Sequence, residues 1–112
     1  MSHTNFQIRH LATEVETPLS RKQNQVLVDN DNVKAVLFAF AANEGLAEHV
    51  APLPAILQII KGEALLTVEE EATTGTPGTW VQMAARTPHS IKATTPVIML
   101  LTLLKNGNAT TH

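Results

Sequence analysis

The chain has 112 residues, of which 44% are hydrophobic and 16% are charged, with a net charge of −2 and no cysteine. This length fits one domain, and this composition favours a packed core over disorder. The absence of a basic run argues against nucleic acid and membrane surfaces as partners, and the absence of cysteine excludes disulfides and thiolate metal sites.

The first ten residues are polar and lack the charged and apolar segments of a signal peptide, so we expect a cytoplasmic protein. Residues 1–24 are predicted to form an N-terminal extension, and a further short strand is considered near residues 6–9. Residues 25–105 are predicted to form a barrel, and residues 106–112 a flexible tail.

Within the barrel, runs rich in Val, Ile and Thr alternate with turn signals that contain Asn, Asp, Gly or Pro. These runs predict strands at residues 25–29, 33–41, 55–61, 64–70, 79–83, 90–94 and 97–104. Short strands with regular turns are typical of an antiparallel sandwich or barrel. The three consecutive acidic residues at 69–71 are interpreted as a solvated strand end.

The strand predicted at residues 33–41 is apolar on both sides, which indicates cover on both faces. The run at residues 97–104 has the same character and is too short to cross a membrane as a helix. We therefore expect a homodimer, because pairing with a second copy is the commonest way to cover such a surface. Trp80 is predicted to face outward and to lie at an interface.

Five histidines are the natural candidates for a site, and three of them are set aside. His3 and His112 lie near the termini, and His10 stands alone before an irregular stretch. His49 and His89 each follow a turn signal and open a strand region. Taken singly, each is more typical of a structural residue than of a functional one.

The context of these two histidines resembles the motifs of the cupin superfamily, specifically its small single-domain, RmlC-like members of the conserved-barrel type. In the first motif, His49 falls on the first His and Gly62 on the closing Gly, while alanines occupy the second His and the Glu positions (Ala51 and Ala55). In the second motif, Gly78 and His89 match at the right separation, whereas Ala84, Arg86 and Ala93 stand for its Pro, Gly and Asn. The resemblance covers residues 25–105 and implies an all-β fold, an antiparallel jelly-roll β-barrel. It also predicts a positive φ at both glycines.

Metal-dependent cupins hold Fe, Mn, Ni, Zn or Cu with three His and one Glu inside the barrel, and only His49 and His89 are present here. The resemblance therefore implies at most one divalent transition metal (Zn, Ni, Fe or Mn) held by two His. Strand alternation turns Gln58 away from this site, unless a one-residue slip makes it a third ligand. The alternative is that the two histidines are polar residues lining an apolar pocket, without metal.

Alanines at two ligand positions are expected to leave an apolar cavity at the barrel centre. We predict that it is lined by Ala51, Ala55, Leu57, Ile59, Val81, Met83 and Ile91. Arg86, in the loop before His89, is a candidate for contact with a ligand carboxylate or phosphate, although such an Arg is more often a solvated loop charge.

The function predicted from the sequence is binding of a small organic ligand, with an anionic or oxygen-rich end at the two histidines and an apolar body against Leu57 and Met83. The alternative is a metal-dependent oxygenase or isomerase of the cupin superfamily. A third possibility is an interaction domain without a ligand.

Overall fold

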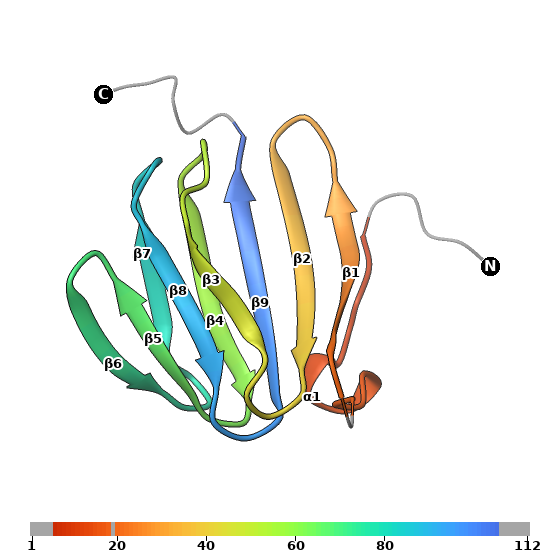
Figure 1. Cartoon of the computed structure of the whole chain (residues 1–112). Coiled ribbons are helices and arrows are strands. Elements are labelled where there is room, and N and C mark those ends of the chain that lie inside the picture. The colour runs from red at the N-terminus through yellow and green to blue at the C-terminus, as the bar shows by residue number, and fades with distance from the viewer. Residues whose placement is uncertain (1–5, 19, 106–112) are drawn as a thin grey trace.

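The computed structural model describes residues 6–18 and 20–105. In this part of the chain nine β-strands follow one short helix (Figure 1). Their bounds are α1 (Leu11–Glu14), β1 (Lys22–Asp29), β2 (Val33–Phe40), β3 (Gly45–His49), β4 (Ala55–Lys61), β5 (Ala64–Val68), β6 (Glu71–Gly75), β7 (Trp80–Met83), β8 (His89–Ala93) and β9 (Val97–Leu104). No helix among these residues is long and apolar enough to span a membrane.

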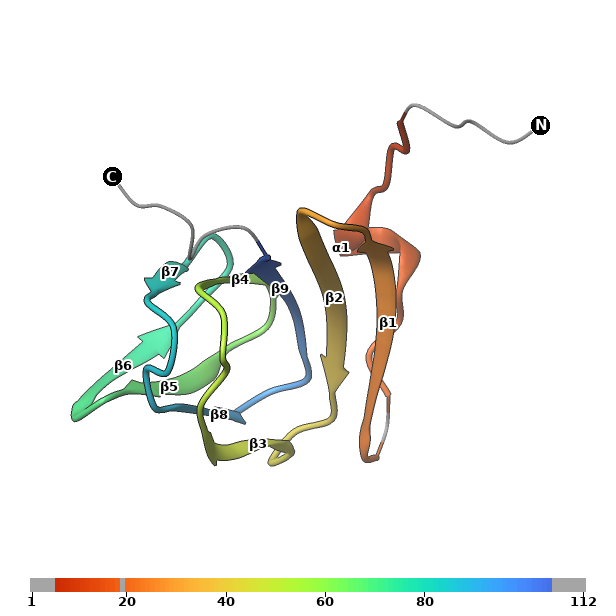
Figure 2. The same ribbon diagram turned by 90° about the horizontal axis from the view of Figure 1, so that it is seen from above.

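The strands form two antiparallel sheets, one of five strands in the order β1-β2-β9-β4-β7 and one of four in the order β3-β8-β5-β6. Seen from above, the two sheets face each other across a closed interior (Figure 2). The antiparallel all-β barrel predicted from the sequence is confirmed. Its interior is filled by the inward side chains of both sheets, namely Phe40, Ala55, Leu57, Ile59, Ala64, Leu66, Met83, Ile91, Ala93, Val97 and Met99.

The outer face of the large sheet is also apolar, and residues of the same chain cover part of it. Ala39 and Ile98 are paired across β2 and β9, and both are buried although neither belongs to the interior core. The N-terminal segment lies on this outer side (Figure 2), where α1 contacts β4 and Val15 lines a small crevice with Leu37 and Ala39. The two-sided cover expected of residues 33–41 is therefore confirmed, and the covering layer includes the chain's own N-terminal segment.

Hydrogen bonds within the N-terminal segment hold it together at α1. The carboxylate of Glu14 accepts the His10 backbone N–H at 2.7 Å and the Arg9 Nε at 2.7 Å. The His10 hydrogen bond, followed by that from Arg9, holds the pKa of Glu14 below its ordinary value. The side chain of Gln7 donates to the Leu27 carbonyl, which ties the segment to β1.

The strand predicted at residues 25–29 begins three residues earlier, at Lys22, and two other predicted elements also differ from the structure. Residues 6–9 form no strand, because a single side-chain contact from Gln7 replaces a backbone ladder there. The strand predicted at residues 64–70 ends at Val68, because Glu69 adopts a φ of 54° and begins a turn. Strands β3 and β6 were not predicted: β3 pairs through a bulge, and β6 contains no large apolar side chain.

Glycines occupy two positions with a positive φ, as predicted. Gly62 has a φ of 88° in the hairpin between β4 and β5, and Gly78 has a φ of 97° before β7. A Cβ added at Gly62 would come within 2.0 Å of the Pro96 carbonyl oxygen. Only glycine fits there, because the backbones of two turns touch.

Candidate functional site

His49 and His89 lie side by side at one end of the four-stranded sheet. They are register partners across β3 and β8, and their ring centroids are 4.2 Å apart with an angle of 57° between the ring planes. At this end β3, β5 and β7 finish while β4, β6 and β8 begin, so we call it the barrel mouth. The proximity expected of the two histidines is confirmed.

The two imidazoles are held in the same way. Nδ1 of His49 lies 2.8 Å from the Ala47 carbonyl oxygen, and Nδ1 of His89 lies 2.8 Å from the Thr87 carbonyl oxygen. A carbonyl oxygen only accepts, so each Nδ1 carries the ring hydrogen and donates it. In a neutral ring Nε2 then carries a lone pair, and both rings present an acceptor at this atom.

The burial of the histidines makes an unpaired Nε2 atom energetically costly. His89 is 7% exposed and faces inward with Ile91 and Ala93, while His49 is half-buried nearer the opening. Among the described residues neither Nε2 has a hydrogen-bond partner. A buried polar atom without a partner costs about 1–3 kcal/mol, so His89 Nε2 marks a place for a ligand, an ion or a water.

The two loops that carry the histidines are joined to each other. The backbone N–H of Arg86 donates to the Ala51 carbonyl at 2.7 Å, and the Thr87 hydroxyl donates to the Ala84 carbonyl at 2.8 Å. Arg86 has a φ of 66°, the left-handed conformation that favours glycine, at the position where the cupin motif has Gly. Arg86 therefore contributes to this end of the barrel through its backbone, and its side chain is exposed.

The open central cavity predicted from the alanines is not present. Ala55, Leu57, Met83 and Ile91 are each at most 4% exposed and belong to the packed interior. Met83 lies opposite Ala55 in the register, and its flexible thioether side chain suits the space beside a small residue. These side chains form the core, so an apolar ligand body does not fit against them in this structure.

Gln58 lies on the wrong face to be a third ligand. Its neighbours Leu57 and Ile59 point into the core, and Gln58 is the register partner of Trp80, which is 57% exposed. Directly paired residues share a face of a sheet, so Gln58 points outward. The outward orientation predicted for Trp80 is confirmed.

The residues present do not fit the four-ligand metal centre of metal-dependent cupins. The kind of donor is suitable, because a histidine that ligates a metal commonly donates its other ring N–H to a carbonyl. The number of donors is too small, since no group of three or more His, Cys, Asp or Glu residues in the described part of the chain could hold an ion. Ala51 and Ala55 supply no donor side chain at the two other positions.

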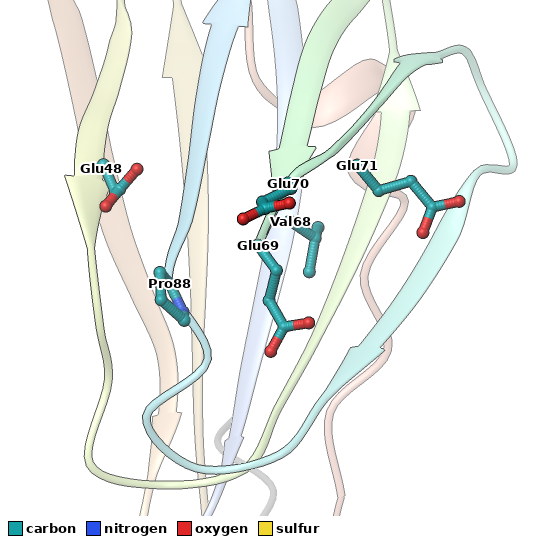
Figure 3. A pocket seen from close by; sticks show the side chains of 6 residues that line it. All are labelled: Glu48, Val68, Glu69, Glu70, Glu71 and Pro88. Atoms are coloured by element: carbon teal, nitrogen blue, oxygen red, sulfur yellow. The ribbon is translucent and has the colours of Figure 1, made fainter.

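An acidic cavity of about 730 Å³ lies at the same end of the four-stranded sheet, although neither histidine lines it, and it was not predicted from the sequence. It is lined by Glu48, Val68, Glu69, Glu70, Glu71 and Pro88. Figure 3 shows Glu48 on one side of Pro88 and Glu69 and Glu70 on the other, with Glu71 pointing away from Glu48. Glu48 could have been found from the sequence, because it precedes His49. The position of residues 69–71 in this cavity could not, because it depends on the pairing of β5 with β8.

Solved structures of cupins resemble this chain over most of its length. A cupin superfamily protein from Desulfitobacterium hafniense is 26% identical, with a TM-score of 0.78 over 84% of this chain and 86% of its own. An RmlC-like cupin from Desulfovibrio desulfuricans is 20% identical, with a TM-score of 0.80 over 90% of this chain and 98% of its own. The chain has the fold of a small cupin domain.

Enzymes are found among the structural neighbours of this cupin. Salicylate 1,2-dioxygenase from Pseudoaminobacter salicylatoxidans matches 77% of this chain and 28% of its own, with a TM-score of 0.70 and 14% identity. At that identity the likeness concerns the fold alone. No family model and no curated protein sequence matches the chain.

Proposed function

We propose that this cupin binds a small organic molecule at the barrel mouth, with His49 and His89 as its polar contacts. The observation that carries the proposal is the pair of Nε2 atoms, one of them on the buried ring of His89, that have no partner in the described part of the protein. Polar groups fixed by backbone hydrogen bonds are preorganised, which lowers the entropic cost of binding a ligand.

The ligand is placed at the mouth, outside the packed interior. The side chains below the histidines are closed against each other, whereas His49 is half-buried and Val50, which follows it, is 53% exposed. Because the apolar interior is packed, we expect polar contacts at the mouth to carry most of the recognition. We expect a small, polar ligand bound weakly.

A divalent ion such as Zn, Ni, Fe or Mn, held by the two Nε2 atoms, is the second candidate. It is favoured by the hydrogen bonds from each Nδ1–H to a carbonyl, a common second contact of metal-ligating histidines. Two protein ligands give a weaker site than three or four. The alternative of a metal-dependent oxygenase or isomerase requires this ion and has no further support from the side chains at the mouth.

Metal analysis and ligand screening together test the proposal. The protein is purified without a nickel column, its metal content is measured, and thermal shifts are recorded with small acids, amines and sugars before and after a chelator. The proposal expects shifts that persist after chelation and disappear in His49→Ala and His89→Ala. Stoichiometric metal that is lost in both variants would favour the second candidate, and no shift under any condition would contradict a ligand site.

We also propose that two copies associate through the outer face of β7. Trp80 is exposed there on an edge strand, although the N-terminal segment covers part of the surface on which the expectation of a dimer first rested. Sedimentation at micromolar concentration should give twice the 12.1 kDa of one chain, and Trp80→Ser should give the single mass. A single mass for the unaltered protein would contradict the dimer.

A further inference from the structure

The hydrogen-bond pattern of the histidine pair indicates what kind of group it can bind. Both Nδ1 atoms donate to carbonyl oxygens, so each neutral ring offers only a lone pair at Nε2. Two acceptors beside each other are satisfied by a group that donates. A carboxylate offers acceptors only, and it therefore makes no hydrogen bond to this pair unless a ring gains a proton.

The charged residues around the histidine pair also favour a ligand group that donates hydrogen bonds. Glu48 and Pro88 immediately precede the two histidines, and Val68 is the register partner of His89. These three residues line the acidic cavity together with the glutamates at positions 69, 70 and 71, and no basic side chain is among its lining residues. The Glu69 backbone N–H donates to the Pro88 carbonyl at 2.8 Å, which fixes the acidic turn beside the β8 strand that carries His89. Four carboxylates repel an anionic ligand and attract a cationic one.

We propose that the ligand group recognised by His49 and His89 is a protonated aliphatic amine, bound directly and without a metal ion. This inference rests on the proposed ligand site and names its chemical class. An ammonium group has three N–H donors and no acceptor, so it can donate to both Nε2 atoms while its charge is offset by the nearby glutamates. The anionic or oxygen-rich end expected from the sequence is therefore replaced by a cationic donor.

A second amine in the same ligand would lie towards the acidic cavity. That cavity is lined by the chain neighbours of both histidines and not by the histidines themselves, so a short diamine tests whether a second ammonium reaches Glu69 or Glu70 while the first is held at the pair. The two sets of contacts predict separable effects. Removal of a histidine weakens mono- and diamines alike, whereas neutralising the glutamates weakens the diamine more than the monoamine.

The test compares three probes of similar length, namely butylamine, 1,4-diaminobutane and butyrate. Binding to chelator-treated, dialysed protein is followed near neutral pH by NMR, through the ring signals of the five histidines. We expect saturable shifts of His49 and His89 with both amines and none with butyrate. His49→Ala or His89→Ala should weaken both amines by about tenfold or more, since a hydrogen bond to a charged group is lost.

Matched variants separate the contributions. Glu69→Gln combined with Glu70→Gln should weaken 1,4-diaminobutane several-fold and butylamine to a smaller extent. His10→Ala, at an exposed histidine outside the site, should change neither amine. The backbone amide spectrum of each variant shows whether it is folded, and the glutamate variants test the inference even if a histidine variant is not.

The remaining outcomes overturn the inference in distinguishable ways. Butyrate binding at His49 and His89 without metal would contradict the amine and leave the proposed ligand site standing. Butyrate binding only after Zn²⁺ is added would favour the metal-held ligand. No response of the two histidines to any probe, with or without Zn²⁺, would overturn both the inference and the proposed function.

Discussion

The two sheets of the barrel differ in what their outer faces carry. On the five-stranded sheet, the paired ends of β2 and β9 are buried on both faces, with Ala39 and Ile98 covered from outside and Phe40 and Met99 packed inside. On the four-stranded sheet only the inner face is buried, and outer-face side chains such as Leu65, which is 47% exposed, meet solvent. The histidine pair and the acidic cavity both belong to the four-stranded side.

We infer from this difference that one sheet supports the barrel and the other carries the proposed ligand contacts. A strand buried on both faces resists change, because each side chain is fixed by two layers. A sheet with one exposed face can carry polar groups at its end without leaving them unsatisfied in the core. The five-stranded sheet therefore serves as scaffold, and the mouth end of the four-stranded sheet carries the proposed site.

Substitutions on the two outer faces give the largest expected contrast. Ile98→Ala should lower the free energy of unfolding by about 2–5 kcal/mol, because it removes fully buried methyl groups and leaves a cavity. Leu65→Ala should cost less than about 1 kcal/mol, because this side chain is already half in water. Urea denaturation of the two variants checks this, and equal losses would contradict the asymmetry between the sheets.

Arg86 tests whether the mouth depends on a backbone or on a side chain. Arg86→Gly should raise stability by about 1 kcal/mol, because glycine adopts a positive φ without a Cβ penalty. Arg86→Ala removes the guanidinium but keeps the strain, so its stability should stay near that of the parent. If both variants lose stability or amine affinity equally, the guanidinium has a role that the structure does not assign to it.

Acid should affect the scaffold side through two carboxylates. A hydrogen bond from Lys105 holds the pKa of Asp29 below its ordinary 3.8, and that from His10 does the same to Glu14 below 4.5. A lowered pKa in the folded state means that the stabilisation is present above the ordinary value and is lost as pH falls through the folded one.

We therefore expect a small decrease in the thermal midpoint on acidification below about pH 4. Both carboxyls are exposed, so the effect should be the smallest of the three. Asp29→Asn and Glu14→Gln should each flatten the profile. A profile that the two substitutions leave unchanged would place the acid sensitivity elsewhere.

The sequence predicted the parts of the fold that depend on local patterns. The strands at residues 55–61 and 97–104 were predicted with their observed bounds, because long apolar runs between turn residues leave little freedom. Gly62 and Gly78 were correctly assigned a positive φ. His49 and His89 were correctly brought together, although the signal was the spacing of the cupin motifs and not the residues alone.

What the sequence missed depends on pairing between distant segments. Strand β3 has only three ladder positions and a bulge, and β6 is a polar edge strand, so neither has a clear alternation. The filled interior was missed because neighbouring side chains such as Met83 occupy the space left by Ala55. The glutamates at positions 69–71 are exposed where β5 ends, as predicted, but their place in the cavity beside Pro88 could not be predicted because it requires the register of β5 with β8.

His49 and His89 are inferred to present two acceptors at the mouth, and the tautomers of their rings show whether they do. Long-range ¹H–¹⁵N correlation spectra above the titration range of histidine report which ring nitrogen carries the hydrogen. We expect a protonated Nδ1 and an unprotonated Nε2 in both rings of the unliganded protein. A protonated Nε2 in either ring would contradict it, because the pair would then offer a donor where the proposed ligand must donate.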